Sequence, residues 1–80
     1  MTSLAQLPPE SRAVVTTLPA AHGLARRLIA MGLAPGSEVR VVQNRGHGPL
    51  IIEVHGVRLA LGRGQAARVL VERLPEREEV

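Results

Sequence analysis

The residues of this chain best suited to metal chemistry are its three histidines, His22, His47 and His55, together with the carboxylate Glu53. On a strand, residues two apart point to the same face, so Glu53 and His55 could contribute two ligands together. A zinc or iron site needs three or more fixed ligands with supporting hydrogen bonds. No spacing here is typical of such a site, and cysteine is absent. We therefore expect no resident metal or cofactor; His47, Glu53 and His55 are the candidates for weak binding of Fe2+ or another divalent cation.

Nucleophilic catalysis has little support in the sequence. Cys, Asp, Tyr and Lys are all absent, so a nucleophile would have to be a serine or a threonine. Ser37 is one candidate, but a nucleophile also needs a positioned base and a group that orients this base. The glycines of Gly62–Arg68 precede a possible helical turn, yet the phosphate-binding loop of nucleotide hydrolases requires a lysine. The sequence predicts no catalytic residues and a protein that is not an enzyme.

Length and composition favour one small cytoplasmic domain. The 80 residues allow a single domain, with its core expected over residues 4–74 and a disordered acidic tail over residues 75–80. No apolar run approaches the roughly 20 residues that span a bilayer, and the start of the chain does not resemble a secretory signal. The net charge is +3, but the absence of aromatic side chains removes the platforms on which nucleic-acid bases stack. We expect no nucleic-acid partner.

Hydrophobic periodicity predicts a mainly β protein. Five segments are rich in β-branched or alternating apolar residues, which is typical of strands. They are Arg12–Leu18, Glu38–Gln43, Leu50–Val54, Val57–Leu61 and Arg68–Glu72. In the fourth strand Val57, Leu59 and Leu61 are expected to point inward. Residues 1–11 are expected to be an irregular lead-in, and five short strands favour closure into a small barrel, which leaves no free sheet edge.

One short helix is predicted between the first two strands, over His22–Met31. Leu24, Leu28 and Met31 recur at i, i+4 and i+7, so they form the face expected to pack on the barrel. Arg26 points away from that face and Arg27 lies at its edge.

The segment after this helix is predicted to be a stop followed by a turn. Gly32 stands where a helix commonly ends in a left-handed conformation, and Leu33 is the apolar residue that often closes such an end. Pro35 and Gly36 suit the centre of a type II turn. We therefore expect Gly32, Pro35 and Gly36 to be structural residues.

The stretch Arg26–Val42, which reads RRLIAMGLAPGSEVRVV, resembles the ferrous iron transport protein A (FeoA) family. That family carries an Arg-Arg-Leu-x-x-Met-Gly-Leu-x-Pro-Gly-x-x-Val core, matched by Arg26, Arg27, Leu28, Met31, Gly32, Leu33, Pro35, Gly36 and Val39. Gly56–Glu72 is similar to the end of the family, and Leu4–Leu18 to its opening. The chain departs at Gly46–Pro49, which reads Gly-His-Gly-Pro where members often have Gly-Asp-Pro.

The resemblance implies a small SH3-like five-stranded β-barrel that acts as a non-enzymatic accessory or regulatory protein of ferrous iron uptake. Its partner would be the membrane ferrous iron transporter B, whose cytosolic side includes a GTPase, so the chain would lie in the cytoplasm or at the inner face of the membrane. Arg26 and Arg27 would be the partner-binding residues, and a weak homo-oligomer is left open. The fold also resembles the C-terminal domain of iron-dependent repressors, so a metal-binding sensor or chaperone is the alternative function.

Overall fold

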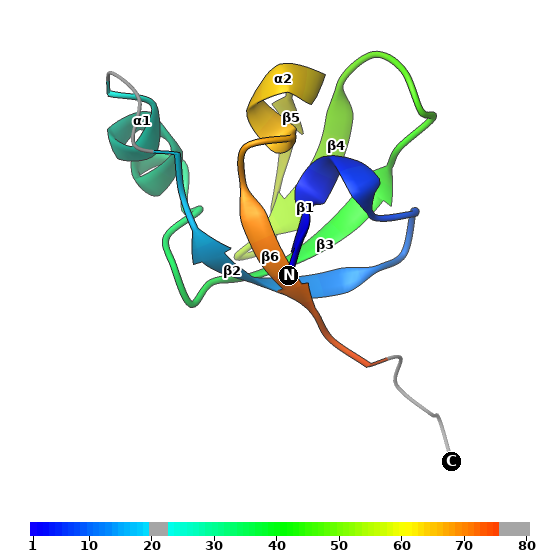
Figure 1. Cartoon of the computed structure of the whole chain (residues 1–80), viewed down its shortest axis with the longest axis horizontal. Helices are drawn as coiled ribbons and strands as arrows, with labels where there is room; N and C mark the ends of the chain where they lie inside the picture. The colour runs from blue at the N-terminus through cyan, green and yellow to red at the C-terminus, as the bar shows by residue number, and fades with distance from the viewer. Residues whose placement is uncertain (20–22, 76–80) are drawn as a thin grey trace.

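A computed structural model describes residues 1–19 and 23–75 of the chain. Within them, one antiparallel sheet has the strand order β1-β6-β2-β3-β4-β5 (Figure 1). Its six strands are β1 (Thr2–Ser3), β2 (Arg12–Thr17), β3 (Glu38–Gln43), β4 (Leu50–Val54), β5 (Val57–Leu61) and β6 (Leu70–Arg73). The helices are the 3-10 helix η1 (Leu4–Gln6), α1 (Leu24–Ala30) and α2 (Arg63–Ala66). The expected helical position of His22 and the expected disorder of residues 76–80 lie outside the described residues.

The prediction of a mainly β protein is confirmed, but the prediction of a closed five-stranded barrel was wrong. The lead-in is not irregular, because Thr2 and Ser3 pair with Val71 and Leu70 and add a sixth strand. The sheet stays open, since β1 pairs only with β6 and β5 only with β4 among the described strands. The 3-10 helix η1, which follows β1, and α2, which follows β5, contact each other (Figure 1). None of the described helices is long and apolar enough to cross a membrane.

The core is aliphatic and follows the alternation of the strands. On β4, Leu50, Ile52 and Val54 are buried, as their spacing predicted. The inward prediction for β5 holds only towards its end: Leu61 is buried, Leu59 is half-buried and Val57 is 56% exposed. The strand lies at the edge of the sheet, so the core covers only part of it. The buried apolar residues are Leu4, Leu7, Ala13, Val15, Leu28, Leu33, Val39, Val41, Leu50, Ile52, Val54, Leu61, Ala66, Val69 and Val71.

Helix α1 packs through a narrower face than its periodicity predicted. Leu28 is buried and Leu24 is half-buried against the core, but Met31 is 36% exposed. The helix ends at Ala30, and Met31 has φ −87° and ψ 0°, so it no longer continues the helical face. The inward prediction for Met31 was therefore wrong.

The predicted end of α1 is confirmed in detail. Gly32 has φ +98°, and its N–H donates to the carbonyl of Ile29 over 2.9 Å. The N–H of Leu33 donates to the carbonyl of Leu28, also over 2.9 Å, and the Leu33 side chain is fully buried. These two hydrogen bonds define a Schellman motif, which satisfies carbonyls that a helix end leaves free.

Tight turns direct the following strands. The N–H of Ser37 donates to the carbonyl of Ala34 over 2.9 Å, and Gly36 has φ +92°, as a type II turn requires. His55 and Gly56 both have positive φ, at 51° and 77°, which is the conformation of a type I′ hairpin turn. The last strand starts at Leu70, later than predicted, because the turn after α2 includes Arg68 and Val69.

Candidate interaction surface

The outward side of α1 combines arginine and apolar side chains. Arg26 and Arg27 are both exposed, and Ile29 is 50% exposed. Residues three or four apart are neighbours on a helix surface, so Arg26 lies beside Ile29. The chain from residue 11 to residue 37 contains no Asp or Glu, so the helix carries positive charge without a neighbouring acid in sequence. Such a surface suits a partner that offers carboxylates and an apolar contact.

Gly32, the residue after the C-cap of α1, lies against the β4–β5 hairpin. A Cβ placed on Gly32 would lie 3.2 Å from Cδ2 of His55 and 3.7 Å from Cγ1 of Val54. Val54 is the cross-strand partner of Val57, the exposed first residue of β5. The exposed apolar side chains of Met31 and Val57 therefore flank one contact between helix and hairpin.

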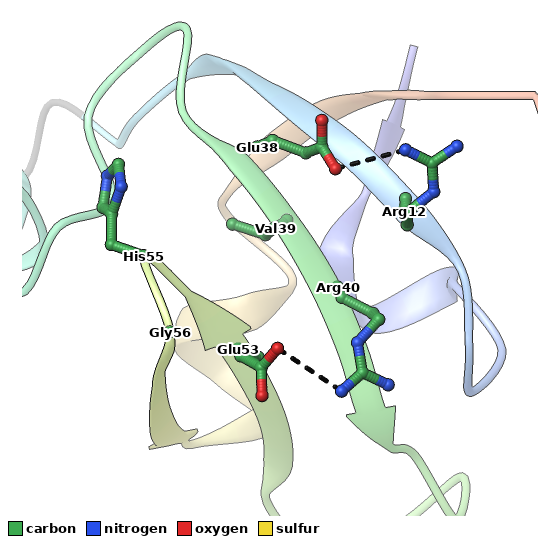
Figure 2. Close-up of a pocket in the computed structure, with 7 residues that line it drawn as sticks. All are labelled: Arg12, Glu38, Val39, Arg40, Glu53, His55 and Gly56. Carbon is green, nitrogen blue, oxygen red and sulfur yellow. Dashed lines mark hydrogen bonds and ion pairs between the residues drawn. The ribbon is translucent and has the colours of Figure 1, made fainter.

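A second feature is a charged hollow of about 310 Å³ on the outer face of β2, β3 and β4 (Figure 2). Arg12 and Arg40 are directly opposite in the ladder of β2 and β3. Two like charges so placed repel each other, and each has its own carboxylate: Arg12 lies 3.2 Å from Glu38, and Arg40 lies 3.4 Å from Glu53. The hollow is lined by Arg12, Glu38, Val39, Arg40, Glu53, His55 and Gly56.

The carboxylates beside this hollow are engaged by arginines. Glu53 also lies 3.7 Å from Arg58, and Glu10 lies 3.2 Å from Arg40. A carboxylate held between two guanidinium groups is a poor ligand for a cation, because the metal would have to displace them. The hollow is therefore best described as an ion-pair network that neutralises the outer face of the sheet.

The candidate metal ligands are not brought together. His47 lies in the loop before β4 and His55 lies in the turn after it, so the whole strand separates them. Glu53 and His55 both line the hollow, but no group of three His, Cys, Asp or Glu residues suited to a metal occurs in residues 1–19 and 23–75. His22 lies outside this part of the chain.

One polar network was not anticipated from the sequence. Asn44, the residue after β3, donates from Nδ2 to the carbonyls of Ala5 at 3.0 Å and Leu7 at 2.8 Å. Arg63 of α2 donates from Nη2 to Asn44 Oδ1 at 2.6 Å and from Nε to the carbonyl of Gly48 at 3.2 Å. The only sequence signal was an Asn at a strand end, where this residue type often bonds to nearby backbone. The network joins η1 and the residue after it to the β3–β4 loop and to α2.

Comparison with known proteins decides the family. The FeoA domain matches residues 2–73. A curated relative from Methanocaldococcus jannaschii that is named as an Fe(2+) transport protein A is 39% identical over 59 residues, which are 74% of this chain and 71% of the relative. The chain belongs to the FeoA family.

Solved structures of FeoA proteins have the same fold. A crystal structure of an iron uptake regulatory protein (FeoA) is 37% identical, with a TM-score of 0.86, and the match covers 91% of this chain and 97% of that one. The FeoA of Stenotrophomonas maltophilia, described as an SH3 domain protein and solved with zinc, is 38% identical with a TM-score of 0.75, over 90% of this FeoA chain and 91% of that chain. The family is implicated in ferrous iron transport, and the fold of this chain is SH3-like.

The same fold occurs within metal-dependent repressors. A manganese-dependent transcriptional repressor matches with a TM-score of 0.84 over 91% of this chain, but over only 41% of its own length and at 20% identity. At that identity the likeness concerns the fold alone.

Proposed function

We propose that this FeoA protein is a non-enzymatic, cytoplasmic accessory of ferrous iron uptake that binds the cytosolic side of the membrane ferrous iron transporter B. Family membership supports a role in ferrous iron uptake, because the relatives are named for ferrous iron transport. The observation that carries the binding role is the outward side of α1, where Arg26 and Arg27 stand exposed in an acid-free stretch.

The anchoring of α1 supports this assignment. The helix is attached through Leu28 and the Schellman motif, so its outward residues are not needed for the core. A helix that is already formed before binding loses less conformational freedom than a disordered segment would, which favours affinity. Paired charges across an interface also speed association and restrict the choice of partner.

The test is a titration of the chain into purified ferrous iron transporter B, with GTP analogue and with GDP. We expect saturable binding that Arg26→Glu weakens by about tenfold, the effect of losing roughly 1.4 kcal/mol. The matched control is Arg45→Glu, which makes the same charge change at an exposed position in the β3–β4 loop, on the other side of the molecule from α1 (Figure 1). Equal weakening by both variants would indicate a general charge effect and exclude α1 as the contact.

The absence of binding by the unaltered chain in either nucleotide state would overturn the proposal. Binding in only one of the two states would instead show that the interaction is coupled to the GTPase cycle.

A further inference from the structure

The free edge of β5 carries few of the features that protect a sheet edge from pairing with another strand. The pairing of β4 with β5 runs without a register shift from Leu50↔Leu61 to Val54↔Val57, whereas both the β2–β6 and the β3–β4 ladders are interrupted. The strand at the opposite end of the sheet, β1, has only two residues. Proteins commonly protect sheet edges with bulges, prolines, short strands or charges. Along β5, Arg58 is the only such device.

Two residues of β5 direct their backbone groups to that edge. In a hairpin with a two-residue turn, the pair that flanks the turn is hydrogen-bonded and bonded pairs then alternate. Val57, Leu59 and Leu61 therefore bond to β4. The N–H and C=O groups of Arg58 and Ala60 point the other way, and no backbone partner is found for them within the described residues.

Exposed apolar side chains lie near the turn at which this edge begins. The exposed large apolar side chains within the described residues are Met1, Ile29, Met31 and Val57. Three of these four belong to α1, to its C-cap or to the start of β5. The contact of Gly32 with His55 and Val54 brings the end of α1 to the hairpin that begins β5. We call the surface formed by Arg26, Arg27, Ile29, Met31, Val57 and Arg58 the α1–β5 corner.

The charge of the corner is one-sided. Residues 11–37 and 54–71, which include both of its parts, contain no Asp or Glu. Arg58 is 65% exposed at its side chain and has Glu53 at 3.7 Å, a carboxylate that Arg40 already contacts at 3.4 Å. An incoming strand would thus meet amide groups, apolar side chains and arginines.

We infer that the α1–β5 corner binds an extended segment of a partner protein, in which acidic and apolar residues alternate, and that this segment pairs with the free edge of β5. Alternation places apolar residues against Val57 and Leu59 and a carboxylate against Arg58, since successive side chains of a strand point to opposite faces. This inference rests on the proposed function, in which the partner is the transporter. A second copy of the chain brings its own arginines and a net charge of +3 to the same edge, and a lipid surface cannot form the ladder of backbone hydrogen bonds.

The decisive variant is Ala60→Pro, with Ala60→Thr as its control. Proline removes an N–H that points away from β4, which sheets tolerate at an edge, while threonine keeps that N–H on a side chain that favours strands. In titrations with the purified full-length transporter, we expect Ala60→Pro to bind about tenfold more weakly, from the loss of edge hydrogen bonds. We expect Ala60→Thr to bind as the unaltered chain does. The thermal unfolding of both variants is compared first.

Amide hydrogen exchange of the unaltered chain gives a second readout, which holds even if Ala60→Pro fails to fold. The amides of Arg58 and Ala60 should become protected when the transporter is added. Equal binding by the two Ala60 variants, or unprotected Arg58 and Ala60 amides in the complex, would overturn the inference and leave the proposed function intact. No binding of the unaltered chain would overturn both. If the chain dimerises and Ala60→Pro abolishes the dimer, the corner binds a second copy of the chain. If the chain binds phosphatidylglycerol vesicles without the transporter as well as it binds the transporter, the corner binds lipid. Either result would overturn the inference.

Discussion

The imidazole ring of His55 lies against the backbone of Gly32, close enough that a Cβ on Gly32 would stand 3.2 Å from His55 Cδ2. Gly32 also has φ +98°, a region that residues with a Cβ rarely adopt. The glycine thus ends α1 and allows the β4–β5 turn to approach it. Both parts of the α1–β5 corner are positioned by this contact.

Replacement of Gly32 by alanine should therefore lower the free energy of unfolding for two reasons. The left-handed backbone costs an alanine about 1–2 kcal/mol, and the new methyl group must displace the His55 ring. Gly36→Ala is the matched control, because Gly36 has φ +92° and, apart from its chain neighbours, no atom of the described residues lies within 4 Å of its Cβ position. Denaturant unfolding should show the larger loss for Gly32→Ala.

A double variant separates the two causes. His55→Gly removes the ring and suits the positive φ of that turn position. In its presence, Gly32→Ala should cost no more than Gly36→Ala costs in the unaltered chain. If Gly32→Ala and Gly36→Ala destabilise equally with His55 in place, the ring contact does not contribute to stability.

Asn44 should contribute to the free energy of unfolding through the hydrogen bonds of its side chain. Asn44→Ala leaves the carbonyls of Ala5 and Leu7 without this donor and removes the oxygen that accepts from Arg63 Nη2. Unpaired groups that are partly buried cost about 1–3 kcal/mol, so unfolding should shift by that amount. Arg45→Ala, at the exposed neighbouring residue, should stay within about 0.5 kcal/mol of the unaltered chain. An equally mild effect of Asn44→Ala would mean that water replaces these hydrogen bonds.

Local features of the fold could be predicted from the sequence because each depends on a few adjacent residues. Gly32 and Leu33 predict the helix end, and Pro35-Gly36 and His55-Gly56 predict their turns. Proline presets the φ of its turn position, and glycine adopts the positive φ that the other positions need. The alternation of Leu50, Ile52 and Val54 predicts the buried face of β4 in the same way.

The errors concern features that depend on distant contacts. Thr2 and Ser3 form a strand only because Leu70 and Val71 lie beside them, and two residues have no periodicity of their own. The exposure of Val57 follows from the place of β5 at the end of an open sheet, which the alternation within β5 does not reveal. For the candidate interaction surface, helical spacing predicts the exposed position of Arg26 but places Arg27 only at the edge of the packed face, and the structure has both exposed. The nearby edge of β5 required the three-dimensional arrangement.

Metal binding by the isolated chain is the remaining test of the alternative function. A strand rises about 3.3 Å per residue, so the five residues of β4 keep His47 and His55 far beyond the roughly 2 Å ligand distances of a shared zinc or iron ion. Glu53 is held by Arg40 and Arg58. An anaerobic titration of the chain with Fe2+, monitored by calorimetry, should show no saturable binding at micromolar concentrations. The variants His47→Ala and His55→Ala should give the same result. His22→Ala is the third arm, because His22 lies outside the described residues. Stoichiometric binding that His55→Ala abolishes would instead support a metal sensor built around the outer hollow.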